Sequence, residues 1–197
     1  MSVNTLDYYN NNADVFAKGT IDVEMHTLQD KFLSYLDKGS FVLDLGCGAG
    51  RDSAYFLSKG MRVEAVDGSE KLVEIATVNT SLPVRHLLFE NLDYKDVFDG
   101  IWACASLLHV KKDDIKEILN KCFMALKVNG IFYLSFKQGN FEGERNGRYF
   151  SDYTLDEIES ILSSFDNNIV LDGFITKDAR PDRTESWVNV IVKKVRG

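Results

Sequence analysis

The stretch FVLDLGCGAGRDSAYFL, residues 41–57, decides the fold that we expect for this chain. A short, mostly apolar run enters a loop that contains Gly46, Gly48 and Gly50, and a helix-prone segment follows. Glycine lets the backbone approach a ligand closely and adopt conformations that a side chain would forbid. The N-terminus of the following helix offers unpaired N–H groups and a partial positive charge. The stretch therefore predicts a strand, a ligand-binding turn and a helix.

The chain beyond this stretch continues to alternate between β-prone and helix-prone segments. We expect strands at residues 41–45, 62–67, 84–89, 98–106 and 131–136, and helices at about 52–59, 69–78 and 113–126, with a turn at 127–130. Strands that alternate with helices indicate βαβ units, and such units build a mostly parallel sheet with helices on both faces.

The two ends of the chain depart from this alternation. Residues 1–39 predict one or two helices, and residues 137–152 are polar with three glycines, so we expect an irregular loop there. A helix is expected at about 154–165, and strands at 168–176 and 186–195 pair most easily as an antiparallel hairpin. The predicted fold is α/β: a Rossmann-like, doubly wound, seven-stranded sheet, mostly parallel, with a C-terminal antiparallel hairpin. We expect one domain over residues 1–197, with a helical lid at 1–39 and a core at 40–197. The lid carries Tyr8, Tyr9 and Phe16 over the ligand; alternatively, Tyr8 and Tyr9 pack against the sheet.

Composition and charge narrow the class of protein. The 23 basic and 30 acidic residues give a formal charge of −7, which argues against holding nucleic acid by charge alone. Cys47, Cys104 and Cys122 are far apart, so a zinc site or a disulfide framework is not expected. We predict no metal, because no His, Asp and Glu residues show metal-ligand spacing. A signal peptide and an apolar run of roughly 20 residues are both missing, so we expect a cytoplasmic location.

Two common ligands of glycine loops fit this loop poorly. A phosphate-binding P-loop needs Lys and then Ser or Thr after its last glycine, where this chain has Arg51 and Asp52. A dinucleotide fingerprint needs a third small residue where Arg51 stands. Asp52 would also repel a pyrophosphate. Asp67 follows Gly46 at a spacing that suits either a dinucleotide or another adenosine cofactor.

The pattern D-x-G-x-G-x-G, residues 44–50, resembles the first motif of class I S-adenosylmethionine-dependent methyltransferases. The resemblance implies S-adenosyl-L-methionine as the cofactor and S-adenosyl-L-homocysteine as its product. It implies that Asp44 helps to bind the methionine ammonium and that Asp67 accepts the ribose hydroxyls. The implied cofactor-binding residues are Asp44, Gly46, Cys47, Gly48, Gly50, Arg51, Asp67, Gly68, Ser69, Phe89, Glu90, Cys104 and Ala105. The residues alone leave open that the glycines only make a tight turn, and that Phe89 belongs to the core.

Later segments sharpen the resemblance. GIWACASLLHV, YLSFKQG, NGRYFSDYT and RPDRTESWVNVIV look like a bacterial small-molecule group near the tellurite-resistance-type methyltransferases. The resemblance implies that His109 lies close to the transferred methyl group, which makes it the candidate catalytic residue. The alternative is that His109 holds its loop by hydrogen bonds. Cys104 is not expected to be a nucleophile, because no neighbouring His or Lys in the sequence would activate it.

Cations and aromatic side chains on the later loops indicate an acceptor pocket. Predicted substrate-binding residues are Tyr8, Arg148, Tyr149, Arg183 and Trp187. Cations with aromatic rings suit a small molecule that is anionic or aromatic. Salt bridges from Arg148 to Glu144, and from Arg183 to Asp182 or Glu185, are the alternative explanation for the arginines.

The predicted function is S-adenosylmethionine-dependent methyl transfer to a small molecule. Two alternatives stay open: a methyltransferase that modifies RNA or protein, and a non-enzymatic sensor that binds the cofactor or its demethylated product. We expect no nucleic-acid or membrane partner. The sequence does not decide between a monomer and a dimer.

Overall fold

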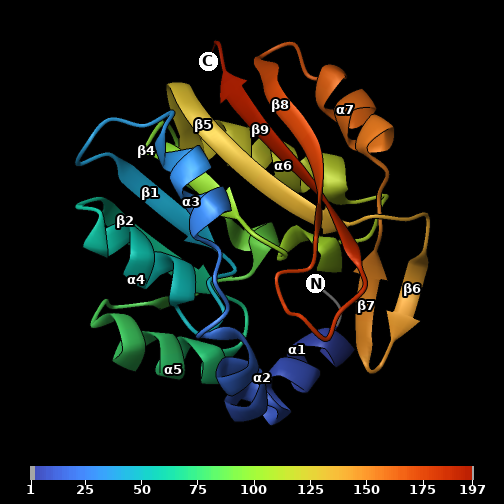
Figure 1. Cartoon of the computed structure of the whole chain (residues 1–197). Helices are drawn as coiled ribbons and strands as arrows, with labels where there is room; N and C mark the ends of the chain where they lie inside the picture. The colour runs from blue at the N-terminus through green and yellow to red at the C-terminus, as the bar shows by residue number, and fades with distance from the viewer. Residues whose placement is uncertain (1–2, 197) are drawn as a thin grey trace.

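The computed structural model describes residues 3–196 and centres on a seven-stranded sheet (Figure 1). The strand order is β3-β2-β1-β4-β5-β9-β8. The strands β1 to β5 are parallel, and β9 is antiparallel to both β5 and β8. Their bounds are β1 (Phe41–Leu45), β2 (Arg62–Asp67), β3 (Arg85–His86), β4 (Phe98–Ala103), β5 (Leu126–Lys137), β8 (Asn168–Lys177) and β9 (Ser186–Lys194). The predicted fold class is therefore confirmed.

Helices cover both faces of the sheet. On one face, α3 (His26–Leu33) and α4 (Arg51–Ser58) bury Phe32 and Phe56 against Trp102 of β4. On the other face, α6 (Ile115–Ala125) and α7 (Leu155–Ser163) pack on a larger apolar core. The helix α5 (Glu70–Thr80) begins where the Ser69 hydroxyl accepts a hydrogen bond from the Leu72 amide, as expected of an N-cap serine.

Three sequence predictions are corrected by the fold. Residues 137–152 are not irregular, because β6 (Glu142–Arg145) and β7 (Arg148–Ser151) form a separate antiparallel hairpin. Asn146 and Gly147 both have positive φ, at 51° and 76°, as a tight two-residue hairpin turn requires. The third strand is only two residues long, and Phe89 lies in the short 3-10 helix η1 (Phe89–Asn91). The strand β5 begins five residues early and runs through the expected turn at 127–130.

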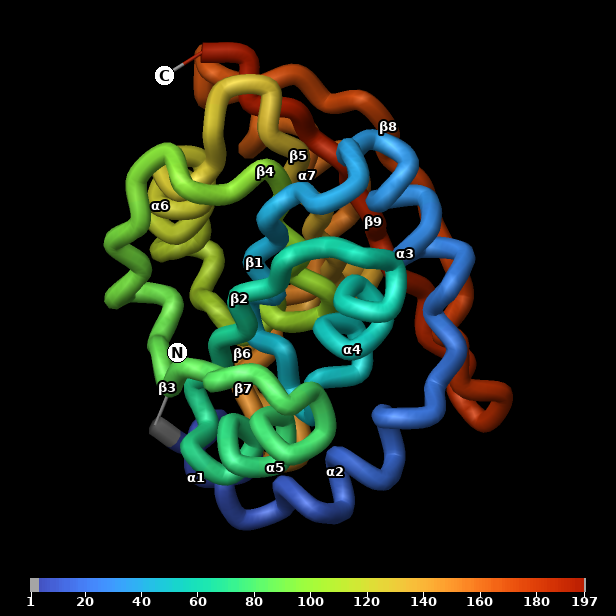
Figure 2. Tube along the Cα trace, turned by 90° about the vertical axis from the view of Figure 1, so that its left-hand side faces the viewer, coloured from blue at the N-terminus to red at the C-terminus, as the bar shows by residue number. Residues whose placement is uncertain are grey.

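The N-terminal segment forms more helices than the one or two expected. The helices α1 (Val3–Asn11) and α2 (Ala13–Thr20) precede α3, and an irregular connector at residues 21–25 joins α2 to α3. Figure 2 shows α1, α2 and α5 together at one end of the molecule. The helix α1 packs against both α5 and β7, so it bridges the glycine-loop side of the sheet and the hairpin.

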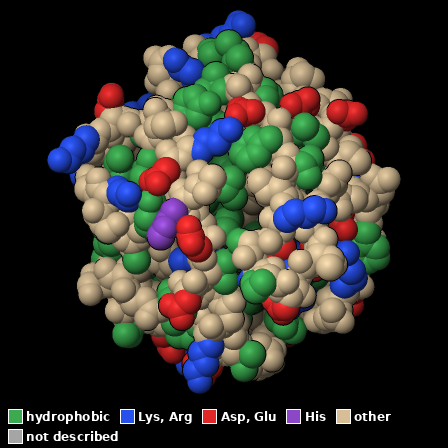
Figure 3. Space-filling view, viewed as in Figure 1, with side chains coloured by type: hydrophobic (Ala, Val, Ile, Leu, Met, Phe, Trp, Pro, Cys, Tyr) green, Lys and Arg blue, Asp and Glu red, His purple; other side chains and the backbone are tan. Residues whose placement is uncertain are grey.

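Charges are mixed on the surface. On the face in Figure 3, Lys and Arg side chains alternate with Asp and Glu side chains, without a broad basic region. Within residues 3–196, no helix combines the length and the apolar character that crossing a membrane requires. The same part of the chain contains no group of three or more His, Cys, Asp or Glu side chains placed to hold a metal ion.

Candidate functional site

The glycine loop leaves β1 and turns sharply into α4. The amides of Gly46 and Cys47 both donate to the carbonyl of Val66 in β2, at 2.9 and 3.0 Å. Gly46 has a φ of +80°, and a Cβ at this position would lie 2.5 Å from the Cβ of Ser106. Side chains rarely adopt such a φ, and that distance leaves no room for one. Glycine is therefore required here both for the turn and for the close approach of the segment after β4.

Asp67 ends β2 and holds the loop. Its Oδ2 accepts the Gly48 amide at 2.9 Å, and its Oδ1 accepts the Ser69 amide at 2.8 Å. Removal from water raises the pKa of Asp67 to about 6, although both hydrogen bonds act in the opposite direction. Each carboxylate oxygen has more than one lone pair, so Asp67 can accept further hydrogen bonds from a ligand's hydroxyl groups.

Two more carboxyl groups lie beneath the loop, and their surroundings differ. Asp52 is saturated: it accepts two hydrogen bonds from Arg51 at 2.8 and 2.9 Å, one from Gln29 at 2.7 Å and one from Trp102 at 2.8 Å. Asp44 is only 2% exposed and accepts from the Ser53 hydroxyl at 2.6 Å. Burial and the nearby Asp52 raise the pKa of Asp44 to about 8. A cationic ligand would relieve this buried acid.

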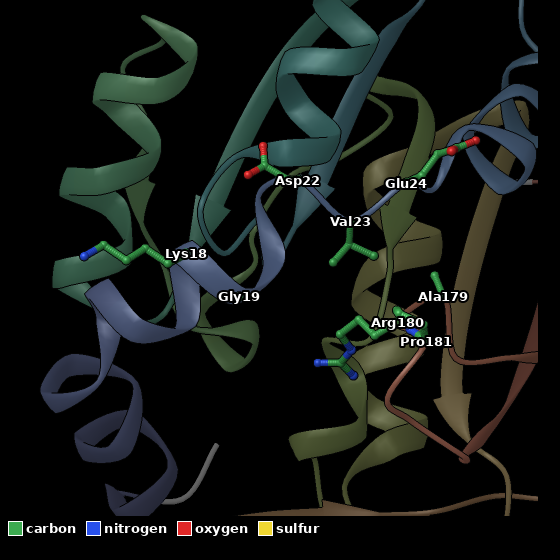
Figure 4. Close-up of a pocket in the computed structure, with 8 residues that line it drawn as sticks. All are labelled: Lys18, Gly19, Asp22, Val23, Glu24, Ala179, Arg180 and Pro181. Carbon is green, nitrogen blue, oxygen red and sulfur yellow. The ribbon is translucent and has the colours of Figure 1, made fainter.

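Two hollows flank the connector at residues 21–25. One, of about 410 Å³, is lined by the connector, Gln29, Arg51 and Tyr55. The other, of about 250 Å³, lies between Lys18 to Glu24 and the turn at 179–181 (Figure 4). Within the described residues, the buried Oε1 of Gln29 has no hydrogen-bond partner. An unsatisfied buried acceptor is unfavourable, so this carbonyl suits a donor such as an ammonium group.

The N-terminal helices lie directly over the glycine loop. The ring of Phe16 lies 3.3 Å from where a Cβ of Gly48 would stand. Tyr9 packs edge-on against Phe16, with ring centroids 5.1 Å apart. Asn10 accepts a hydrogen bond from the Ser69 hydroxyl at 2.7 Å. These contacts make α1 and α2 a cover over the predicted cofactor-binding residues.

His109 lies in the short 3-10 helix η2 (Leu107–His109) after β4 and is 3% exposed. Its Nδ1 is 2.6 Å from the carbonyl of Tyr149, and its Nε2 is 2.8 Å from the hydroxyl of Tyr9. A carbonyl only accepts, so Nδ1 carries the proton. Burial lowers the pKa of His109 to about 4, so the ring is neutral near pH 7 and Nε2 accepts from Tyr9. Both imidazole nitrogens are therefore engaged.

The remaining predicted cofactor residues gather at the same end of the sheet. Phe89 is buried and lies 3.5 Å from the Cβ position of Gly46. Gly68 is covered by Leu88 and by Leu6 of α1. Glu90 is exposed. After β4, Ala105 has a φ of 52°, and its amide donates to Ser135.

The cysteine thiols near the loop are not activated. Burial raises the pKa of Cys104 to about 12 and that of Cys47 well above its usual value. Because the thiolate is the nucleophile, neither side chain is suited to nucleophilic catalysis. This agrees with the expectation for Cys104.

The predicted substrate-binding residues fall into two groups. Tyr8, Arg148 and Tyr149 lie together where α1 meets β7. Arg183 and Trp187 belong to the β8–β9 hairpin: Arg183 is 3.8 Å from Asp182, and Trp187 donates to Asp178 at 3.1 Å. Lys137 lies between the two groups, 5.4 Å from the ring centroid of Phe150 and 5.9 Å from that of Trp187.

The two alternative salt bridges have different outcomes. Arg183 does approach Asp182. Among residues 3–196, Arg148 makes no salt bridge with Glu144, whose carboxylate accepts from Asn4 at 2.9 Å. The salt-bridge explanation therefore applies to Arg183 and not to Arg148.

The sequence placed Tyr9 and Phe16 in the expected lid without naming their partners, and it did not indicate Gln29 at all. Their contacts with His109, Gly48 and Asp52 join segments far apart in the chain. The adjacent aromatic pair at positions 8 and 9 was a usable signal for α1. Nothing local in the sequence indicates which partner each ring meets.

Comparison with known proteins agrees with this geometry. Residues 42–130 match the family model described as "Methyltransferase domain". The chain is 30% identical over 122 residues to a ubiquinone biosynthesis O-methyltransferase of Nitrobacter winogradskyi, covering 59% of this chain and 46% of that protein. It is 29% identical over 126 residues to the S-adenosyl-L-methionine-dependent Diels-Alderase iccD of Talaromyces variabilis, covering 58% and 42%. The chain thus spans less than half the length of these two relatives.

A solved structure supports the fold. The 1,6-didemethyltoxoflavin-N1-methyltransferase of Burkholderia thailandensis, solved with its substrate and S-adenosylhomocysteine, superposes with a TM-score of 0.78 at 24% identity, covering 97% of this chain and 85% of that one. Together these findings support the prediction from the sequence that the chain is a class I S-adenosylmethionine-dependent methyltransferase. The predicted cofactor of this class, S-adenosylmethionine, is likewise confirmed.

The hydrogen-bond acceptors of this site fit that cofactor. The buried Asp44 and the unsatisfied Gln29 carbonyl suit an ammonium group, and Asp67 suits a pair of hydroxyls.

Proposed function

We propose that the protein transfers a methyl group from S-adenosylmethionine to a small-molecule acceptor. The observation that carries the proposal is the pairing of Asp67 with the Gly48 amide, which fixes an acid beside the glycine loop at the ends of β1 and β2. We assign the ribose hydroxyls to Asp67 and the ammonium to Asp44 and Gln29. When bound, the cofactor supplies a methyl group made electrophilic by its sulfonium.

The chain's own contribution is positioning and exclusion of water. Methyl transfer is a direct displacement, so alignment of the nucleophile with the methyl group is the main requirement. We infer that α1 and α2 act as the predicted lid, because Phe16 covers Gly48 and Asn10 holds Ser69. A closed cover also strengthens electrostatic interactions within the site.

We assign His109 to positioning in this closed arrangement. Its neutral ring fixes the Tyr9 hydroxyl through Nε2 while Nδ1–H is held by Tyr149. A base with a pKa of about 4 is a poor acceptor for a proton from an alcohol or an ammonium group. For His109 to act as a catalytic base, Tyr9 must first move away from Nε2.

The proposed acceptor is small and anionic or aromatic. Support comes from Arg148 among the rings of Tyr8, Tyr9 and Phe150. The −7 charge and the mixed surface of Figure 3 offer little to an RNA backbone. A cofactor-dependent function without methyl transfer is the second candidate, since one relative is a Diels-Alderase. Formation of S-adenosylhomocysteine separates the two, because only methyl transfer produces it.

The test is calorimetric titration of the whole protein with S-adenosylmethionine, S-adenosylhomocysteine and NADH. We expect the first two to bind and Asp67→Ala to weaken both by at least about tenfold, since two charge-assisted hydrogen bonds are lost. Asp93→Ala, which removes an exposed acid elsewhere, is the control. Binding of NADH alone would contradict the proposal. Incubating the protein and S-adenosylmethionine with acceptor candidates and measuring S-adenosylhomocysteine then tests turnover.

A further inference from the structure

Arg148, at the start of β7, lies between aromatic rings. The carbon of its guanidinium is 4.5 Å from the ring centroid of Tyr8, 5.1 Å from that of Phe150 and 5.7 Å from that of Tyr9. Tyr8 and Tyr9 come from α1, whereas Phe150 lies on β7 itself. Cation–π contacts use the faces of the planar guanidinium, so its N–H groups point along the edges.

These N–H groups are largely unpaired. Nη1 donates a long hydrogen bond of 3.4 Å to the Tyr9 hydroxyl. The buried Nε has no hydrogen-bond partner within residues 3–196, and no carboxylate of the described chain lies within 4.0 Å of the guanidinium. A partly buried cation without an anion is unfavourable, so this environment suits a ligand that supplies one.

A neighbouring arginine shows the ordinary arrangement. Arg145 lies on β6 of the same hairpin, opposite Arg148 in the register. Its guanidinium also packs on rings, at 4.3 Å from Phe141 and 4.7 Å from Phe150, but Nη2 is 2.5 Å from the carboxylate of Asp152. The two arginines share an aromatic setting and differ in having an acidic partner.

A row of aromatic rings connects Arg148 with the glycine loop. Tyr9 contacts Phe16, and Phe16 covers Gly48 of the glycine loop. Tyr9 also contacts His109, with ring centroids 5.4 Å apart. The row thus leads from the cofactor loop to Arg148, so a flat acceptor along it would place one end near the loop and the other at Arg148.

We propose that Arg148 is the specificity-determining residue of the acceptor site and binds a carboxylate on an aromatic acceptor. The unpaired Nε, which is buried in this closed arrangement, belongs to the edge with which arginine forms bidentate pairs with carboxylates. The inference rests on the proposed function and narrows its substrate class to aromatic carboxylic acids. A carboxylate also occurs on the methionine part of the cofactor, so the experiment must distinguish the two sources.

The experiment compares aromatic acids with their neutral amides. Calorimetry measures binding of 4-hydroxybenzoate against 4-hydroxybenzamide, and of indole-3-acetate against indole-3-acetamide, with and without saturating S-adenosylhomocysteine. The proteins are the wild type, Arg148→Gln and the matched control Arg145→Gln. We expect the wild type and the control to bind at least one acid about tenfold or more tighter than its amide. In Arg148→Gln the ratio should fall to about one, with the affinity for S-adenosylhomocysteine changed by less than about twofold.

Each other outcome overturns the inference in a recognisable way. A wild-type ratio near one for both pairs, or a ratio that survives in Arg148→Gln, means that no acceptor carboxylate is bound there. If Arg148→Gln loses affinity for S-adenosylhomocysteine but not for 5′-methylthioadenosine, which lacks the carboxylate, the anion belongs to the cofactor. If the wild type fails to bind S-adenosylhomocysteine, the proposed function is contradicted instead. The ratio of acid to amide affinity, measured in the absence of S-adenosylhomocysteine, then still tests whether Arg148 binds a carboxylate.

Discussion

At the scale of single residues, His109 shows how burial decides chemistry. The ring is enclosed between the Tyr149 carbonyl and the Tyr9 hydroxyl, and burial lowers its pKa to about 4. The same histidine in water would be partly protonated near pH 6.5. Its position after β4 made it a catalytic candidate, whereas its hydrogen bonds make it first a neutral anchor for α1.

The depressed pKa of His109 predicts acid-sensitive stability. Below about pH 6.5 the imidazole is protonated in the unfolded chain but stays neutral in the folded chain. The free energy of unfolding therefore falls as the pH falls from about 6.5 to 4. The loss reaches about 3 kcal/mol at pH 4. Urea unfolding between pH 4 and 7.5 measures this loss. In His109→Gln the free energy of unfolding should depend less on pH over the same range. His26→Gln removes an exposed ring and is the control. An NMR titration of His109 with a midpoint above 6 would contradict the prediction.

Two glycines with nearly the same φ allow the cost of backbone strain to be measured separately from the cost of steric crowding. Gly39 and Gly46 have φ of +82° and +80°, but only at Gly46 would a Cβ meet another atom, 2.5 Å from the Cβ of Ser106. Gly39→Ala should cost about 1 kcal/mol of unfolding free energy from backbone strain alone. Gly46→Ala should cost about 1–3 kcal/mol more and weaken S-adenosylhomocysteine binding by at least about tenfold. Equal effects in both variants, in unfolding and in calorimetry, would show that the loop can relax around a methyl group.

At the scale of elements, α1 and α2 join parts of the molecule that do not otherwise meet. Thr5 accepts the Tyr149 amide at 2.9 Å, on the hairpin side, and Asn10 holds Ser69 on the α5 side. Few apolar side chains of these helices are deeply buried, with Ala13 and Ala17 the buried ones of α2. Such an element opens more readily than the sheet.

A lid made of α1 and α2 predicts a local response to the cofactor. Amide hydrogen exchange in residues 3–20 should slow by about tenfold or more when S-adenosylhomocysteine binds, because opening then requires release of the ligand. Exchange in β4 and β5 should change less. Mass spectrometry of peptides from both regions makes the comparison within one sample. Unchanged exchange in residues 3–20 beside a protected glycine loop would mean that these helices are a fixed part of the fold.

How far the sequence predicted the elements depended on where their information lies. The strand, loop and helix of residues 41–57 carry their own signals, apolar side chains and then glycines, and all three formed as expected. The β6–β7 hairpin was missed because its side chains are mostly polar, although Asn146 followed by Gly147 is a strong hairpin signal. The contact of Tyr9 with His109 spans 100 residues and depends on the path of α1 across the sheet, which no local pattern specifies.

At the scale of the whole molecule, the distribution of charged side chains bears on whether the acceptor is a small molecule or a nucleic acid. Acidic residues exceed basic ones by 7, and many of the cations that remain are bound in ion pairs, such as Lys137 with Glu185 and Arg180 with Asp178. Arg148, which is partly buried, differs from these cations in lacking an acidic partner among the described residues. A cation placed this way serves a small anion better than a long phosphate backbone.

This distribution of charge predicts that RNA does not bind at physiological salt. Nonspecific binding requires several Lys or Arg side chains on one face to displace counterions from the phosphates, and its affinity falls steeply as salt rises. An electrophoretic shift assay with transfer RNA at 150 mM KCl should therefore show no complex at protein concentrations up to about 10 μM, a concentration within the range of about 10⁻⁶ to 10⁻⁴ M in which nonspecific binders associate. Repeating the assay at 25 mM KCl separates two outcomes. A complex seen only at low salt is the residual attraction of scattered cations and leaves the small-molecule proposal in place. A complex that persists at 150 mM KCl, together with S-adenosylmethionine-dependent methylation of the RNA, would replace the small acceptor with a macromolecular one.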